Sequence, residues 1–348
     1  MVSRNLAVDS DKTVIGSYLC GNFALILGFI SILGRRSALE ANATDLEKRS
    51  GKGKASASSS RPRPDPSSRA GSPESGSPKA KKERFDCRSA TYRTVTIEEF
   101  VYTHHCFPNW GSWKDFLKEK DVHKAMRKIS GDINALLAND RRTTIEPPMN
   151  CLFKAFDVKL DQIKVIILGQ DPTPQANQAC GLAFSVRSNV DPVTVPSIFN
   201  MLVELKWEGM NVGLTNGDLT PWVGEGVLLL NAALTIKQGD RQSSNDHQRI
   251  WGTFTEQLVK YISSNAKPSA WILWGNQAQA YQNFISKSKG HYIRTGGHPS
   301  PMAAINFFGG NYFKCANEFL EENNRGGVRW KLNPRQGVTR EQEKCKDN

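Results

Sequence analysis

The stretch IKVIILGQDPTP, residues 163–174, decides the fold of this chain. Its first part, Ile163–Leu168, is a short apolar run with β-branched residues, which is typical of a strand buried on both faces. Gly169 ends the run, and Asp171 follows beside prolines that fix the local backbone. The stretch therefore predicts a buried strand with a carboxylate at its carboxyl end.

Similar runs occur later in the chain. They predict strands at Val227–Leu230 and Ser269–Trp274, and a weaker strand at His291–Arg294. Apolar residues at helical spacing predict helices at Trp113–Leu117, Val122–Leu137, Ile250–Ser263, Asn276–Ser286 and Asn311–Glu322. Strands that alternate with helices indicate the α/β class, as a single three-layer α/β/α domain around a short, mainly parallel sheet.

Parallel sheets bind ligands beyond the carboxyl ends of their strands. Four segments of interest each follow a predicted strand. They are GQDP after Leu168, Asn231 after Leu230, Gly275 after Trp274, and HPSP after Arg294. We therefore expect these segments to meet at one edge of the sheet. The chain contains no GxGxxG motif, so we expect no nucleotide cofactor.

The first 45 residues contain an apolar segment. Val14–Leu33 is twenty residues long and uncharged, which is enough to span a bilayer. Three interpretations stay open: a membrane anchor, the core of a signal peptide, or part of an organelle-targeting segment. We expect membrane association only through residues 14–33.

A basic linker is predicted to follow. Residues 46–93 are rich in Ser, Pro, Gly and Lys, which is typical of a disordered segment. The chain has a formal net charge of +12, and residues 46–84 hold eleven basic side chains against four acidic ones. A basic arm suits a polyanionic partner, although it also serves solubility. Residues 94–335 are predicted to form the catalytic domain, and residues 336–348 a polar tail.

The sequence favours an intracellular location. Lys79–Arg84 resembles a nuclear-localisation patch, and a solvated basic tether explains it equally well. The chain has seven cysteines, an odd number, and no CxxC pair, which argues against a disulfide framework or a zinc or iron–sulfur site. We expect free thiols, a reducing compartment and a nuclear or mitochondrial protein. His104 and His105 form the only close histidine pair, so no metal is expected.

Four segments, LGQDP, CGLAFSV, VLLLNAALT and HPSP, occur in an order that resembles the family 1 uracil-DNA glycosylases. The resemblance runs from about Trp110 to Trp330. It implies a monomeric enzyme without cofactor that acts on uracil in single- and double-stranded DNA. Such an enzyme flips the base out of the helix, hydrolyses its N-glycosidic bond and leaves an abasic site.

The resemblance assigns roles to the residues after the strands. Asp171 would position the attacking water and stabilise the cationic sugar, and His298 would donate a hydrogen bond to uracil O2 as a neutral imidazole. The backbone N–H of Gln170 would contact the base. The amide of Asn231 would match uracil N3–H and O4, because it offers both an acceptor and donors. Phe184 would stack on the flipped base.

Other residues would hold the DNA. The resemblance places phosphate contacts at Pro196, Ser197, Gly275, Ser300 and Pro301. Met302 stands where the family inserts a leucine into the base stack, and a flexible apolar side chain suits that role.

The chain departs from the family at its first motif, GQDPTP, where the family has GQDPYH. Thr173 replaces the tyrosine that shuts out thymine, and Pro174 replaces the histidine. The loop after His298 is also one residue shorter and lacks the family's basic residue. Two alternatives therefore stay open: a catalytically weak DNA-binding or processivity module, and a glycosylase with relaxed specificity toward thymine or 5-substituted uracils.

Overall fold

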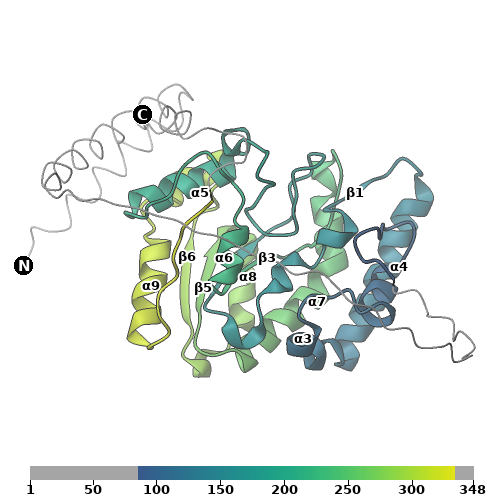
Figure 1. Ribbon diagram of the computed structural model, residues 1–348, viewed down its shortest axis with the longest axis horizontal. Coiled ribbons are helices and arrows are strands. Elements are labelled where there is room, and N and C mark those ends of the chain that lie inside the picture. The colour runs from purple at the N-terminus through teal and green to yellow at the C-terminus, as the bar shows by residue number, and fades with distance from the viewer. Residues whose placement is uncertain (1–84, 334–348) are drawn as a thin grey trace, which may run out of the picture.

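A sheet of four parallel strands forms the centre of the molecule, in the order β3-β2-β5-β6. The computed structural model describes residues 85–333. In Figure 1, α9 lies on one side of the sheet, and α3, α4 and α7 lie on the other. The predicted three-layer α/β/α fold is confirmed. The strands are β2 (Val165–Gly169), β3 (Val227–Asn231), β5 (Ala270–Trp274) and β6 (Tyr292–Gly296).

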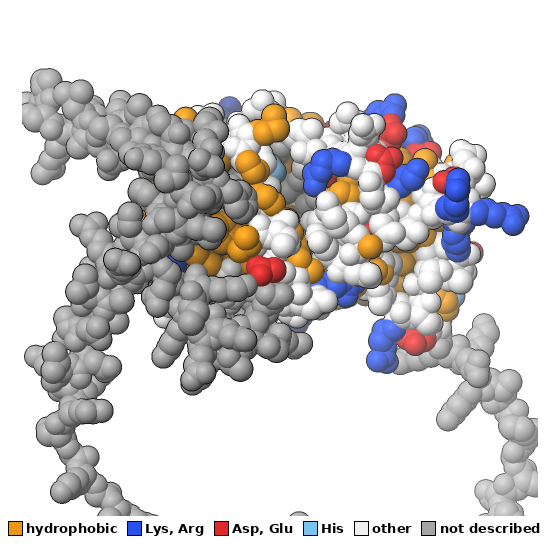
Figure 2. All heavy atoms as spheres, turned by 90° about the horizontal axis from the view of Figure 1, so that it is seen from above, with side chains coloured by type: hydrophobic (Ala, Val, Ile, Leu, Met, Phe, Trp, Pro, Cys, Tyr) orange, Lys and Arg blue, Asp and Glu red, His pale blue; other side chains and the backbone are white. Residues whose placement is uncertain are grey.

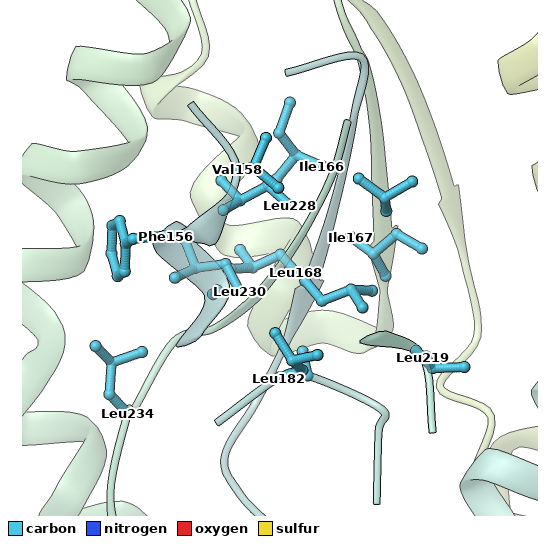
Figure 3. Packing of buried hydrophobic residues seen from close by; sticks show 14 of the residues in the cluster. Phe156, Val158, Ile166, Ile167, Leu168, Leu182, Leu219, Leu228, Leu230 and Leu234 are labelled. Carbon is cyan, nitrogen blue, oxygen red and sulfur yellow. The ribbon is translucent and has the colours of Figure 1, made fainter. Parts of the chain in front are cut away.

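The sheet is buried because helices and loops cover both of its faces. Every residue of β2, β3 and β5 is buried. Figure 3 shows apolar side chains on both sides of the neighbouring strands β2 and β3, with Phe156 toward one side and Leu219 toward the other. A strand with two apolar surroundings needs apolar residues at every position, which explains the uninterrupted runs in the sequence.

Seven α-helices are described within residues 85–333. They are α3 (Trp110–Leu117), α4 (Lys120–Asn139), α5 (Pro196–Trp207), α6 (Thr220–Gly224), α7 (Ser244–Asn265), α8 (Gly275–Ala280) and α9 (Tyr312–Glu322). Of the five helices predicted, α3, α4 and α9 begin and end within three residues of the predicted bounds, whereas α7 and α8 each differ by six residues at one end. Helix α7 starts six positions before the predicted Ile250, and α8 ends early, because the chain continues as a 3₁₀ turn at Tyr281–Phe284.

Helix α5 was not predicted. Its first residue, Pro196, is favourable at that position because a helix start needs no N–H there. Its inward face, however, carries the polar residues Asn200 and Glu204, which are 6% and 1% exposed. Burial of polar residues on a helix hides the amphipathic pattern on which sequence prediction depends.

The folded part begins earlier than the sequence suggested. Residues 85–93 were expected to belong to the linker, yet they contact the domain. Tyr92 donates a hydrogen bond to the Pro147 carbonyl over 2.8 Å. Arg93 donates to the carbonyls of Leu137 and Thr143 near the end of α4. The predicted N-terminal segment, with its apolar run, and the predicted tail at 336–348 lie outside the described residues. Within residues 85–333, no helix combines the length and apolar character needed to cross a membrane.

One disulfide contradicts the prediction of free thiols. Cys87 and Cys106 are bonded, with their Cα atoms 5.8 Å apart, whereas Cys151, Cys180 and Cys315 are free. The chain turns back between the two bonded cysteines, and a separation of 19 residues matches no recognisable cysteine motif. The argument for a reducing compartment from free cysteines therefore loses its support.

Candidate active site

The carboxyl ends of the strands bring the predicted residues to one edge of the sheet. Gly169 of β2 lies in register with Asn231 of β3, and Trp274 of β5 with Gly296 of β6. The loops that follow these residues carry Asp171, Gly275 and His298. The predicted convergence of four segments is confirmed. Figure 2 looks onto the molecule from above and shows apolar side chains over one part of this face and Lys and Arg over another.

Gly169 lets two of the predicted base-binding residues meet. A Cβ atom added to Gly169 would collide with Oδ1 of Asn231 and would lie 2.9 Å from Cβ of Ala183 and 3.3 Å from the ring of Phe184. The segment that carries Phe184 is held beside β3 by a hydrogen bond from the Ala183 N–H to the Leu229 carbonyl. The amide of Asn231 and the ring of Phe184 therefore border the same space above Gly169.

Phe184 has an unusual backbone conformation. Its φ angle is +55°, which is rare for a bulky residue and costs free energy that the surrounding structure has to offset. Its half-buried ring lies 5.0 Å from the ring of Trp274 and 5.8 Å from that of His298. Phe184 thus links Asn231 on one side to His298 on the other, as expected for a base-stacking residue.

The surroundings of His298 select one tautomer. Its Nδ1 accepts a hydrogen bond from the backbone N–H of Ser300 over 3.1 Å, so in the neutral ring Nε2 carries the proton. Burial lowers the pKa of His298 below its ordinary value of 6.5, and the positive charge of Arg241 lowers it further. The ring is therefore neutral at pH 7, with Nε2 as its donor. This is the state that the predicted role requires.

Gly275 makes room for this imidazole. It has a φ angle of +81°, and an added Cβ would approach Cβ of His298 to 3.1 Å. Both observations favour glycine at the start of α8.

Asp171 keeps one oxygen available for chemistry. Its Oδ2 is buried and has no hydrogen-bond partner among the described residues. Burial raises the pKa of Asp171 above 3.8, while the Ser244 hydroxyl and the Arg241 charge oppose that rise. Ser244 Oγ also lies 3.0 Å from Nε2 of Gln170 and 2.8 Å from Nε2 of Gln248, and both amides are donors. With its lone pairs taken, the Ser244 hydroxyl can only donate, and its partner is the carboxylate of Asp171.

Arg241 and Ser244 were missed by the sequence reasoning. They lie between β4 (Ile236–Lys237) and the first turn of α7, in a segment without a recognisable motif. Arg241 acts on Asp171 and His298 by charge alone, which no spacing rule predicts. An Arg followed by two Ser residues, Ser243 and Ser244, a few positions after a strand would have been the only signal.

The atypical Thr173–Pro174 segment is firmly held. The carbonyl of Pro174, a buried residue, accepts a hydrogen bond from the Gly239 N–H over 2.8 Å. Glu146 then ties the segment to the small antiparallel sheet of β1 (Ile145–Glu146) and β4: its Oε1 accepts from the Asn177 N–H over 3.2 Å and from the Gln238 amide over 2.8 Å. The loop is therefore anchored although it lacks the two rings of the related motif.

The predicted DNA-contacting residues lie close to the site. Pro196 and Ser197 form the first turn of α5, and backbone N–H groups at a helix start favour phosphate. The next turn is joined to the HPSP segment, because the Asn200 amide donates to the Pro299 carbonyl over 2.7 Å. Ser300 precedes a 3₁₀ helix, Pro301–Asn306, from which Met302 projects with 98% of its surface exposed. Within residues 85–333, no group of three or more potential ligands could hold a metal ion.

Comparison with known proteins agrees with this geometry. Residues 156–321 match the model of the uracil DNA glycosylase superfamily. The chain is 38% identical over 223 residues to a uracil-DNA glycosylase of Mycoplasmopsis pulmonis, covering 63% of this chain and 97% of the relative. It is 36% identical over 222 residues to that of Aliarcobacter butzleri, covering 63% of this chain and all of the relative. The crystal structure of mimivirus uracil-DNA glycosylase is similar, with a TM-score of 0.58 and 26% identity, covering 70% of this chain and 97% of that one.

Proposed function

Because this chain belongs to the uracil-DNA glycosylase family, we propose that Asp171, Asn231 and His298 act together to excise uracil from DNA. The enzyme is a hydrolase of base excision repair: it releases uracil and leaves an abasic site. One observation carries the assignment of residues. Four groups lie at a single edge of the sheet. They are the Asn231 amide, the Phe184 ring, the His298 imidazole with its proton on Nε2, and the Asp171 carboxylate with a free oxygen.

Recognition of the base falls to Asn231 and Phe184. The base has to leave the helix, since its glycosidic bond is inaccessible in the stack. Asn231, 7% exposed, presents an amide that can accept from uracil N3–H and donate to O4. Cytosine presents the opposite pattern at these positions, so it would leave the buried amide unpaired, which costs free energy. The ring of Phe184 offers the stacking surface.

Bond cleavage divides between Asp171 and His298. The bond between the sugar C1′ and uracil N1 breaks with its electron pair on the base, and the charge spreads to O2. The Nε2–H of His298 donates a hydrogen bond to that oxygen, and a neutral donor avoids protonating the leaving group. A water molecule forms the new bond to C1′ and gives its proton to Asp171, whose ionised form also stabilises the cationic sugar.

The substrate is proposed to include single- and double-stranded DNA. Ser197 at the start of α5 and Ser300 before the 3₁₀ helix offer N–H and O–H groups to phosphates. We assign the exposed side chain of Met302 to the space that the flipped base leaves in the helix. A monomer suffices for this arrangement.

A relaxed specificity is the second candidate, and Thr173 favours it. This residue is half-buried beside the catalytic loop, where a tyrosine would fill far more space. A methyl group in an apolar pocket changes binding by only ~1–3 kcal/mol, so thymine is discriminated weakly without that ring. The alternative of a purely binding module is disfavoured because the chain retains the Asp171 carboxylate and the His298 imidazole, which binding alone would not need, beside Asn231 and Phe184.

The assay that decides the function uses oligonucleotides with a single uracil, as single strands and as U·G duplexes, in the presence of a metal chelator. Alkaline cleavage reports abasic sites. Abasic-site formation supports the glycosylase. Binding without abasic sites would assign the chain to the binding class instead.

We also propose that the protein acts in the nucleus, the mitochondrion or both. The basic patch at Lys79–Arg84 and the apolar segment at residues 14–33 support this. A fluorescent fusion with and without residues 1–45 tests it: signal at the cell surface in both forms would refute it.

A further inference from the structure

One face of α5 holds the loop that carries Met302 at both of its ends. Asn200 and Glu204 are four residues apart, so they lie on the same side of the helix. The Asn200 amide donates to the carbonyl of Pro299, just before the 3₁₀ helix of Met302. Glu204 reaches the other end of the loop, where the chain leaves that helix toward α9. In Figure 1, α5 lies across the top of the molecule, near the start of α9.

The carboxylate of Glu204 is buried and fully used. It is 1% exposed, and Oε2 accepts a hydrogen bond from the Gly309 N–H over 2.9 Å. Oε1 accepts one from the Asn311 N–H over 3.3 Å. A buried carboxylate is costly unless such donors satisfy it, so its presence at this position calls for a specific role.

Arg294 of β6 binds the same turn, Gly309–Asn311. Its Nε and Nη2 both donate to the Gly310 carbonyl, over 2.9 and 2.6 Å. The backbone of Gly309–Asn311 thus has its N–H groups bound by Glu204 and its carbonyl bound by Arg294. Charged groups on two different elements fix this turn, and charge-assisted hydrogen bonds are the stronger class.

The fixed turn continues into the loop itself. The Gly297 N–H donates to the Asn306 carbonyl over 2.8 Å, which closes the loop at its base. Tyr312, the first residue of α9, donates its hydroxyl to the Phe307 carbonyl over 2.8 Å. The outcome is a closed loop with a rigid foundation and one fully exposed apolar side chain, Met302, at its tip.

We propose that Glu204 is a positioning residue for the Met302 loop, and that it sets the efficiency with which the enzyme acts on duplex DNA. The inference rests on the proposed function. Glu204 touches neither the base nor the reacting bond, and it acts by holding the backbone at the exit of the loop. Glu204 should affect excision from duplex DNA more than excision from single strands. Only in a duplex does an apolar side chain have to fill the place of a base that was stacked and paired.

The test compares excision from a U·G duplex with excision from the same uracil strand alone. Glu204→Gln keeps the shape of the side chain but has a single acceptor oxygen, so its NH₂ group would face a backbone N–H. A displaced loop should lower duplex kcat/KM by about tenfold or more and single-strand kcat/KM by no more than about threefold, in line with the cost of misplaced groups. Glu225→Gln is the matched control, because Glu225 pairs with Arg329 on the surface and should leave both rates unchanged.

A double-mutant cycle identifies the route of the effect. If Glu204 acts through Met302, the duplex rate of Glu204→Gln with Met302→Ala should equal that of Met302→Ala alone. Additive losses, or equal losses on both substrates, would overturn the inference. Absence of single-strand excision by the wild type would instead overturn the proposed function. Should Glu204→Gln not fold, as judged by its melting temperature, Asn200→Ala frees the other end of the loop and carries the same expectation.

Discussion

The backbone N–H of Ser300 donates a hydrogen bond to Nδ1 of His298 over 3.1 Å. This contact leaves Nε2 as the protonated nitrogen of the neutral ring and turns that proton toward the site. Ser300 and His298 are two residues apart, with Pro299 between them, so the HPSP segment sets its own tautomer. The sequence motif thus encodes a protonation state as well as a side chain.

Replacement of Asp171 should abolish most of the activity. Asp171→Asn keeps the shape of the side chain but removes the negative charge and the proton acceptor, so we expect kcat to fall by roughly 10²–10⁴-fold. Single-turnover excision from a uracil oligonucleotide measures this. Asp161→Asn, at an exposed position, is the control. Full activity in Asp171→Asn would remove this residue from the mechanism.

The acid side of the pH–rate profile should depend on Arg241. In the proposed mechanism, activity requires ionised Asp171, whose pKa burial raises above 3.8, and neutral His298, whose pKa burial lowers below 6.5. We therefore expect the acid limb of the pH–rate profile to lie between pH 3.8 and pH 6.5, the ordinary pKa values of the two groups. Arg241 lowers both pKa values, so Arg241→Ala should move the acid limb of kcat/KM to higher pH. Arg249→Ala, an exposed arginine paired with Asp246, should leave the limb in place.

Thr173 should control the exclusion of thymine. In Thr173→Tyr a large ring returns to the side of the pocket, so any excision from T·G or 5-substituted substrates should fall relative to U·G. A change of about 10–100-fold in the ratio of kcat/KM values corresponds to the ~1–3 kcal/mol that a methyl group contributes. Identical substrate ranges for wild type and Thr173→Tyr would refute this role. Thr194→Tyr, at an exposed position, controls for a general effect of the substitution.

Glu208 should make the folded state less stable as the pH rises. Burial and the neighbouring charge of Glu204 raise the pKa of Glu208 to about 7, and its Oε1 has no hydrogen-bond partner among residues 85–333. The folded state therefore binds a proton that the unfolded state releases near pH 4.5. Its contribution to stability is complete below that pH and is lost as the pH rises through 7.

Glu208→Gln mimics the protonated side chain and should remove this dependence. We expect the variant to be more stable than wild type at pH 8, by on the order of 1–2 kcal/mol after allowance for partial exposure, and equal to it at pH 4. Urea unfolding at the two pH values measures the difference. Glu225→Gln should behave in the opposite way, because Arg329 lowers the pKa of Glu225. The same difference at both pH values would contradict the prediction.

Strands β2, β3 and β5 were predictable because they are almost wholly apolar, whereas β6, which carries Arg294 and Thr295, gave a weaker pattern. The residues after the strands could be placed because parallel strands share one carboxyl edge. Helix α5 was not, since tertiary contacts bury its polar residues Asn200 and Glu204. The pairing of Cys87 with Cys106 depends on how the intervening chain folds. In the site, motifs led to Asp171, Asn231, Phe184 and His298. Arg241 acts through its charge and Ser244 through a hydrogen bond, and both lie in a segment without a motif.

Gly169 limits how this enzyme can change. Because any side chain there would collide with Asn231 and crowd Ala183, the backbone of β2 forms a fixed floor beneath the proposed base site. New base preferences therefore have to come from substitutions at residues beside the proposed base site and not from a side chain at Gly169. Thr173 lies in the neighbouring loop, two residues after Asp171, and hydrogen bonds anchor that loop independently of any aromatic ring. Substitutions in that loop can therefore alter the substrate range while the floor stays the same.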